Sequence, residues 1–148
     1  MKKKDIRIGN IFTHLGEIVK VTDMSSNAGY SEDFIEVCVF SKYDKGTYYV
    51  SLDIEDEIIE PLPINKKLLD LYQWEEVRGR YQKRFLDLET YIEVTLSLQP
   101  CGDKGGYDFY HNEHFLKHVT YVHELQNILW GLGLNDDVNL EILGKNYK

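Results

Sequence analysis

The stretch TYVHELQNILWGL, residues 120–132, predicts an amphipathic helix. An α-helix turns by about 100° per residue, and with this step the apolar side chains of the stretch gather on one side. Thr120 is suited to cap the first turn, and Gly131 or Gly133 to end the helix in a left-handed turn. We therefore predict a C-terminal helix over residues 120–132. Its apolar side is expected to be buried against a sheet and consists of Val122, Leu125, Ile128, Leu129 and Leu132.

The opposite side of this helix carries four side chains with two open interpretations: His123, Gln126, Asn127 and Trp130. In the first, they form hydrogen bonds to neighbouring strands and hold the helix in place. In the second, they form a recognition face for a partner, because Trp is enriched at interface hot spots and Gln and Asn offer paired donors and acceptors. These four residues are our candidate interaction face.

The motif HELQN at residues 123–127 differs at one position from the zinc-protease pattern H-E-x-x-H. That pattern needs two histidines to hold zinc, and here the second is Asn127, whose amide is a poor zinc ligand. The sequence also lacks the G-x-S-x-G, P-loop and G-x-G-x-x-G motifs. Cys38 and Cys101 have no partner that spacing assigns, and we interpret them as free thiols. We therefore predict no catalytic residue, no bound cofactor and no enzymatic activity.

Three further histidines, His111, His114 and His118, could approach one another around a turn at Asn112-Glu113. His111 and His114 would then form a cross-strand pair with side chains about 5 Å apart, and His118 would lie on the next segment. No acidic or thiol ligand stands beside them at a recurrent spacing. Three imidazoles could in principle hold a divalent metal, but we predict no bound metal here. Because Asn127 removes the second ligand of the HELQN motif, we also predict no rise in melting temperature with added zinc.

Residues 1–60 predict short β-strands, because β-branched and aromatic runs alternate there with turn-forming residues. Short strands without an intervening helix favour a small barrel, which closes on itself to hide its edges. Ile8-Gly9-Asn10 followed by Gly16-Glu-Ile-Val-Lys-Val21 resembles the KOW-type opening hairpin of SH3-like barrels. The resemblance implies an N-terminal SH3-like β-barrel subdomain over residues 1–60. Barrels of this kind bind RNA, proteins or peptides, so the fold alone selects no function.

A second subdomain is predicted over residues 61–148. Pro61-Leu-Pro63 ends the first group of strands and turns the chain. Asn65 is a suitable cap for a short helix over residues 65–73, and strand-like runs follow between residues 82 and 118. With the C-terminal helix, these elements predict an antiparallel sheet packed against two helices. The expected fold class of the whole chain is α+β.

The chain is acidic, with a net charge of −8, which disfavours binding of the whole molecule to a phosphate backbone. Residues 78–84, RGRYQKR, are the local exception. Their cations could contact phosphates while an aromatic ring stacks on a base, so they form our candidate nucleic-acid patch: Arg78, Arg80, Tyr81, Lys83 and Arg84. Residues 53–60, DIEDEIIE, are strongly acidic. They could form a charged sheet edge, or imitate nucleic acid and inhibit a host enzyme.

Residues 121–132 are similar to a YVHxLQN signature near the C-terminus of small proteins found in phages and mobile elements of gut bacteria. Ile8-Gly9-Asn10 and Ile59-Glu-Pro-Leu-Pro-Ile64 match two further marks of that family. The chain departs from the family pattern at Gln73-Trp74, where Gly-Phe is usual, and at residues 135–140, which replace a Gly-Glu-Glu-Leu-like tail. The resemblance implies a phage or mobile-element origin and no particular reaction.

These observations predict a non-catalytic accessory protein that acts through a protein partner. The alternative is a nucleic-acid-binding module that uses the barrel and the basic patch. No apolar run of about 18 residues is present, so we expect no membrane-spanning segment. The free thiols and the lack of a secretion signal favour the cytoplasm of a host cell, or the virion, as the location.

Overall fold

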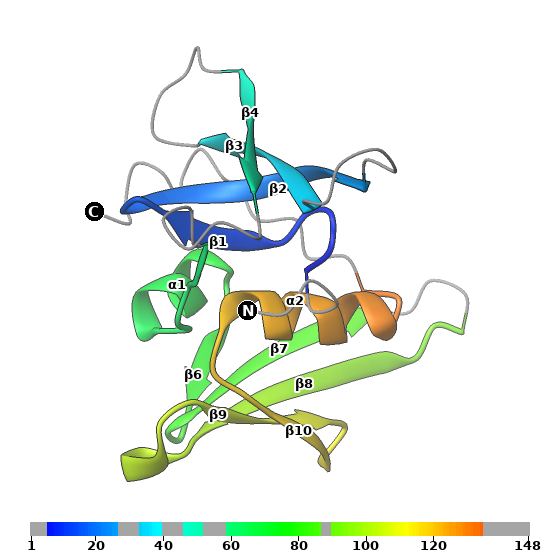
Figure 1. The fold of residues 1–148 in the computed structure, drawn as a ribbon. Helices are drawn as coiled ribbons and strands as arrows, with labels where there is room; N and C mark the ends of the chain where they lie inside the picture. Colours follow the sequence, from blue (N-terminus) through cyan, green and yellow to red (C-terminus); the bar gives the residue numbers. More distant parts are fainter. Residues whose placement is uncertain (1–5, 27–32, 40–45, 52–58, 87–89, 135–148) are drawn as a thin grey trace.

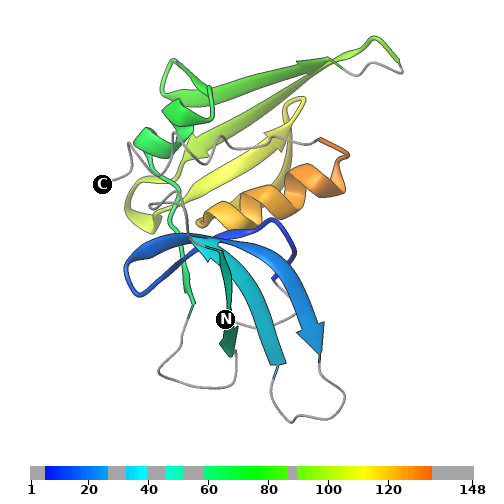
Figure 2. The ribbon, with the colours of Figure 1, turned by 90° about the horizontal axis from the view of Figure 1, so that it is seen from above.

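The computed structural model describes residues 6–26, 33–39, 46–51, 59–86 and 90–134. They form two five-stranded antiparallel sheets. Figures 1 and 2 show that α2 (Val122–Gly131) lies between the two sheets, with the shorter α1 (Lys66–Leu71) beside it. The described chain is therefore mostly β with few helices, and an α+β class is consistent with this architecture. Within these ranges, no helix has the length and apolar character needed to cross a lipid bilayer.

The first sheet has the strand order β4-β3-β2-β1-β5. As the sequence predicts, an opening hairpin forms here: β1 and β2 pair across a turn at Leu15-Gly16, where φ is 50° and 80°. Apolar residues then pair between neighbouring strands, as Val21 does with Val37. The strands are β1 Ile11–His14, β2 Glu17–Ser26, β3 Asp33–Val39, β4 Thr47–Ser51 and β5 Glu60–Pro61.

The closed SH3-like barrel predicted for residues 1–60 is not found in the part of the chain that the structure describes. There, β4 and β5 are the opposite edges of an open sheet. β5 has only two residues, and Pro61 has no backbone N–H to donate to a further strand. Residues 27–32, 40–45 and 52–58, which include most of the acidic run, lie outside the described residues.

The second sheet is an up-and-down meander with the strand order β10-β9-β8-β7-β6. Its turns at Arg78-Gly79 and Asn112-Glu113 have positive φ at both positions, which matches the twist of hairpin strands. The predicted cross-strand pair of His111 and His114 is confirmed. The sequence does not predict β6, because its exposed residues show no apolar alternation. The strands are β6 Glu75–Val77, β7 Arg80–Leu86, β8 Glu93–Pro100, β9 Tyr107–His111 and β10 His114–Val119.

Two helix ends follow the local signals in the sequence. Asn65 caps α1 as predicted, since its side-chain oxygen accepts a 2.9 Å hydrogen bond from the N–H of Leu68. After the C-terminal end of α2, Gly133 adopts a φ of 74°, and the N–H of Leu134 donates a 2.8 Å hydrogen bond to the carbonyl of Leu129. This is a Schellman motif, so the predicted glycine stop is confirmed at Gly133.

The buried apolar side chains form two clusters. The larger one lies between the helices and the second sheet, and it also includes Ile11 of β1. The smaller one belongs to the first sheet and includes Phe12, the chain neighbour of Ile11. Successive side chains of a strand point to opposite faces, so β1 contributes to both clusters. This shared strand ties the first sheet to the rest of the molecule.

The apolar side of α2 packs in the larger cluster. Val122, Leu125 and Leu129 are buried there, as predicted, and Ile128 is half-buried beside them. The prediction for Leu132 is wrong, since its side chain is 36% exposed. The reason is that the helix ends at Gly131, one residue before the end that the sequence predicts, and Leu132 is the C-cap.

Candidate functional site

The candidate interaction face of α2 lies against the first sheet, and Gln126 is its central residue. The Gln126 side chain is only 8% exposed. Its Oε1 accepts a 3.0 Å hydrogen bond from the backbone N–H of Ile11, and its Nε2 donates a 3.1 Å bond to the carbonyl of Gly9. Gln126 therefore binds the backbone at the start of β1 with both ends of its amide.

Asn127 and His123 extend the same contact. Asn127 Oδ1 accepts a 3.0 Å hydrogen bond from Nδ2 of Asn10, which is fully buried. His123 is 5% exposed, and its ring centroid lies 4.9 Å from that of Phe12. Both side chains are thus engaged with the chain's own N-terminal sheet.

Trp130 completes this internal contact by packing on Gly9. A Cβ added at Gly9 would lie 2.9 Å from Cη2 of Trp130, and Gly9 has a φ of 93°. Only glycine combines that backbone conformation with so close an approach. Ile8-Gly9-Asn10 and residues 121–132, which lie more than 110 positions apart in the chain, therefore touch in the folded protein.

Glu124, the acidic residue of the HELQN motif, serves the start of α2. One of its carboxylate oxygens, Oε1, accepts 3.0 Å hydrogen bonds from the N–H groups of Thr120 and Tyr121. Tyr121 is the N-cap, so the predicted cap at Thr120 is displaced by one residue. With Glu124 used as the capping group and His123 buried, the motif has a structural role here.

The candidate nucleic-acid patch is divided between the two faces of β7, because alternate residues of a strand point in opposite directions. Arg80 and Arg84 point away from α2, to what we call the open face of the second sheet. Tyr81 is 7% exposed in the larger cluster. Lys83 lies on that inner side too, and its Nζ donates a 2.6 Å hydrogen bond to the carbonyl of Tyr72. The predicted stacking of Tyr81 on a base is therefore wrong.

The arginines of β7 are close to carboxylates. Arg80 Nη1 lies 3.4 Å from Glu113 Oε2, and Arg84 Nε lies 3.8 Å from Glu93 Oε1. Arg78 occupies the exposed turn before β7. Phosphate binding at Arg80 or Arg84 would compete with these pairs, which weakens the case for a nucleic-acid site.

Arg80, Tyr110 and Phe115 form a row of contacts across the open face. The Arg80 guanidinium carbon lies 4.8 Å from the ring centroid of Tyr110. The Tyr110 and Phe115 rings are 5.8 Å apart and meet edge to face at 69°. At the end of this row, the Phe115 side chain is 56% exposed. Ser97, which lies opposite Tyr110 on β8, is by contrast only 1% exposed. Both helices lie on the other side of the sheet (Figures 1 and 2).

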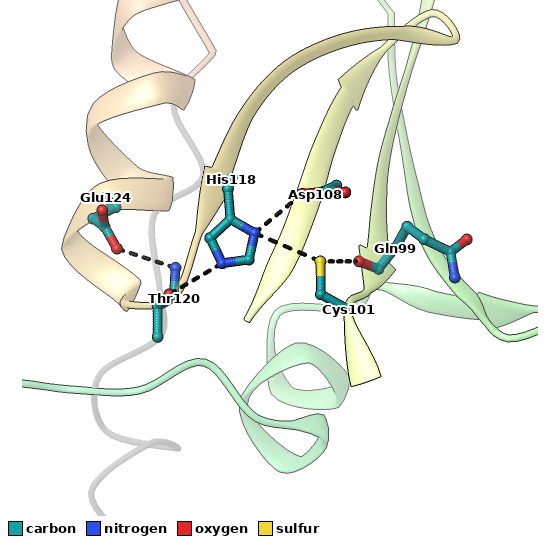
Figure 3. A network of polar contacts seen from close by, with 6 residues as sticks. All are labelled: Gln99, Cys101, Asp108, His118, Thr120 and Glu124. Carbon is teal, nitrogen blue, oxygen red and sulfur yellow. Dashed lines mark hydrogen bonds and ion pairs between the residues drawn. The ribbon is translucent and has the colours of Figure 1, made fainter. Parts of the chain in front are cut away.

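At one end of the second sheet, Cys101, Asp108 and His118 converge (Figure 3). Nδ1 of His118 lies 3.0 Å from Oδ1 of Asp108 and 3.5 Å from Sγ of Cys101. Asp108 is on β9 and His118 is opposite it on β10, while Cys101 follows β8. The sequence places His118 with His111 and His114 instead. The structure separates them, because that pair lies at the opposite end of β10.

A β-bulge at Leu116 produces the pairing of Asp108 with His118. If the register of the His111–His114 pair continued regularly, Asp108 would face Lys117, and His118 would point to the other face. The register instead shifts between Phe115 and Lys117. Spacing from the turn therefore does not reveal this cluster.

The His118 ring is held from its other side as well. Nε2 lies 3.5 Å from Oγ1 of Thr120. Gly106, with a φ of 71°, is so close that an added Cβ would lie 2.7 Å from Nε2. The ring is therefore confined between Gly106, Thr120 and the side chains at Nδ1.

The cluster does not have the geometry of a Cys-His-Asp catalytic triad. In a triad, the nucleophile and the acid contact different nitrogens of the histidine, whereas here both contact Nδ1. Burial and the nearby Asp108 carboxylate raise the pKa of the Cys101 thiol, which disfavours the nucleophilic thiolate. The hydrogen bond with His118 lowers the pKa of Asp108. The arrangement suits hydrogen bonding or metal binding better than nucleophilic attack.

Comparisons with known proteins assign neither a family nor a fold neighbour. No protein-family model, curated protein or solved structure matches the chain significantly. The functional argument therefore depends on the open face and on the Cys101, Asp108 and His118 cluster.

Proposed function

We propose that the protein is a non-catalytic accessory protein of a phage or mobile element and that it acts by binding another protein. The row Arg80, Tyr110 and Phe115 on the open face is the observation that supports this function. Arg and aromatic residues are enriched among interface hot spots, where they supply large contact areas. The origin is inferred from the resemblance of residues 8–10 and 121–132 to the phage-protein signature.

The row is held in place before any partner arrives. Each of its members contacts the next, and Arg80 is also paired with Glu113. Side chains that are already ordered lose less conformational entropy on binding, so more of the contact energy contributes to affinity. The open face is thus suited to recognition by shape and apolar contact.

The edge strand β10 extends this surface. Phe115 is 56% and Leu116 47% exposed, and among the described strands none pairs with the outer edge of β10. The bulge at Leu116 disrupts the regular edge, which discourages indiscriminate strand pairing. A partner that packs on the side chains of Phe115 and Leu116 fits this edge better than one that adds a long strand.

Nucleic-acid binding, the alternative function, has less support from the geometry. Arg80 and Arg84 lie beside carboxylates, Tyr81 is buried, and the chain has a net charge of −8. The related idea of an acidic inhibitor depends on residues 53–60, of which 53–58 lie outside the described residues. We therefore favour a protein partner.

Affinity capture from a host lysate tests this proposal with matched baits. Wild-type protein and Tyr49→Ala, which alters a 62% exposed tyrosine on the other sheet, should recover the same stoichiometric protein. Phe115→Ala and Tyr110→Ala should lose it while their melting temperatures show that they are folded. Capture that is unaffected by both open-face variants would refute the proposed surface. Capture that disappears after nuclease treatment would favour the nucleic-acid alternative.

A further inference from the structure

Three side chains with different ligand chemistry meet at the end of the second sheet. A thiol, a carboxylate and an imidazole each offer one ligand atom, and these atoms all lie within 4.8 Å of one another. Within the described ranges this is the one group of three or more such residues. The residues are Cys101, Asp108 and His118, and Figure 3 shows them converging from three successive segments of the sheet.

The spacing of these atoms can be compared with that of a zinc site. Zinc bonds of about 2.3 Å to sulfur and about 2.0–2.1 Å to nitrogen or oxygen place tetrahedral ligand atoms about 3.3–3.6 Å apart. Sγ of Cys101 and Nδ1 of His118 are 3.5 Å apart, which already fits. Nδ1 and Oδ1 of Asp108 are 3.0 Å apart, so a metal that replaced the bridging hydrogen would require a small opening.

The surroundings of His118 favour Nδ1 as the ligand atom. When one imidazole nitrogen binds a metal, the other usually donates its hydrogen to a protein acceptor that fixes the ring. Nε2 of His118 has such an acceptor in Oγ1 of Thr120, at 3.5 Å. Thr120 is itself fixed, because its N–H donates to Glu124. The side chains of His118 and Asp108 are 27% and 32% exposed, so an ion can reach the site from solvent.

We infer that Cys101, Asp108 and His118 bind a zinc ion, or a divalent metal with similar ligand preference, with a fourth position open to water. One sulfur, one nitrogen and one oxygen ligand suit zinc, whereas calcium and magnesium prefer oxygen ligands alone. The ion joins β9, β10 and the segment after β8. This inference replaces the expectation of a protein without metal, and it is independent of the proposed protein partner.

A hydrogen-bonded cluster without metal is the competing explanation. In that case Nδ1 of His118 donates to Asp108, and the Cys101 thiol donates to the carbonyl of Gln99, 3.6 Å away. The His111–His114 pair is a second competitor, because two adjacent imidazoles can also hold zinc. The experiment therefore needs variants that separate all three.

Zinc titration of the purified full chain, after removal of bound metal with a chelator, provides the test. We expect saturable binding of one zinc ion per chain and a higher melting temperature on binding. Cys101→Ser, Asp108→Asn and His118→Gln should each weaken binding by about tenfold or more. Cys38→Ser and His114→Gln, which alter the same residue types elsewhere, should leave it unchanged. Thr120→Ala keeps all three ligands and should still weaken binding about tenfold.

Cobalt(II) gives a second readout that does not depend on stability. Thiolate coordination produces a near-ultraviolet charge-transfer band, which the wild type should show and Cys101→Ser should lose. Absence of saturable zinc binding would overturn the inference. Binding that survives Cys101→Ser but is abolished by His114→Gln would also overturn it, and would assign the metal to the His111–His114 pair.

Discussion

The backbone N–H of Ile11 donates a 3.0 Å hydrogen bond to Oε1 of Gln126, a residue 115 positions later in the chain. The bond is buried, and the other end of the same amide binds the carbonyl of Gly9. A helix side chain thus pairs with the backbone at the start of β1, where a neighbouring strand would otherwise be needed. The position of α2 between the sheets is therefore specified by polar contacts on one side and apolar packing on the other.

Replacing Gln126 by Met should destabilise the protein. The change removes both hydrogen bonds and leaves the N–H of Ile11 and the carbonyl of Gly9 without their partner in a buried place. We expect the free energy of unfolding to fall by about 1–3 kcal/mol, measured by urea denaturation. Gln82→Met on the open face is the matched control and should change it by less than about 0.5 kcal/mol. Equal effects of the two substitutions would contradict the role assigned to Gln126.

Alanine substitutions at Gly9 and Gly16 separate the stability cost of backbone strain from the cost of a side-chain clash. Both have a positive φ, 93° and 80°, but an added Cβ meets Trp130 at 2.9 Å in Gly9 and nothing within 4 Å in Gly16. Gly16→Ala should therefore lower the free energy of unfolding only by the strain of an alanine in a left-handed backbone conformation, about 1–2 kcal/mol. Gly9→Ala should cost distinctly more in the same denaturation experiment.

A double-mutant cycle identifies the source of that extra cost. Trp130→Leu alone removes packing, but in the Gly9→Ala background it should also relieve the clash. The two changes should then be less damaging together than the sum of their separate effects. Strict additivity would show that Trp130 does not restrict Gly9.

Local signals in the sequence predict the helices well. The cap at Asn65, the glycine stop at Gly133 and the buried side of α2 each depend on residues within one or two turns. The hairpin turn at Asn112-Glu113 is equally local. Such features follow from short-range hydrogen bonding and periodicity, which an isolated sequence contains.

Features that depend on strand pairing and register are the ones that the sequence does not reveal. Whether the first sheet closes into a barrel depends on pairing between its edge strands β4 and β5, and Pro61 limits that pairing because it has no N–H to donate. The meeting of Asp108 with His118 depends on one extra residue at Leu116 that changes which side chains share a face. Cys101 joins them only because the chain turns back after β8. A bulge and a turn of this kind leave no periodic signal.

The same substitution, leucine to alanine, at positions 125 and 132 tests the apolar packing of α2. Leu125 is 6% exposed within the larger cluster, whereas Leu132 is 36% exposed at the helix end. Leu125→Ala should lower the free energy of unfolding by about 2–5 kcal/mol, because it opens a cavity in a packed core. Leu132→Ala should have a clearly smaller effect. A similar loss for both would mean that residues beyond the helix bury Leu132.

The Asp108 carboxylate should make stability depend on pH. Its hydrogen bond with His118 is the main cause of a pKa below the usual 3.8, and Lys104 contributes in the same direction. A carboxyl whose pKa is lower in the folded state stabilises that state when ionised. The contribution is complete above the unfolded pKa of about 3.8 and is lost as the pH falls through the lower folded value.

The difference in melting temperature between wild type and Asp108→Asn, measured with a chelator present, should therefore be present at about pH 5 and shrink below about pH 4. Asp103→Asn, in the exposed turn after β8, is the control variant, because it removes a carboxylate outside the cluster. An Asp108→Asn difference that instead grows as the pH falls from about 5 to about 3 would mean that the hydrogen bond with His118 favours the neutral carboxyl and that the pKa of Asp108 is raised.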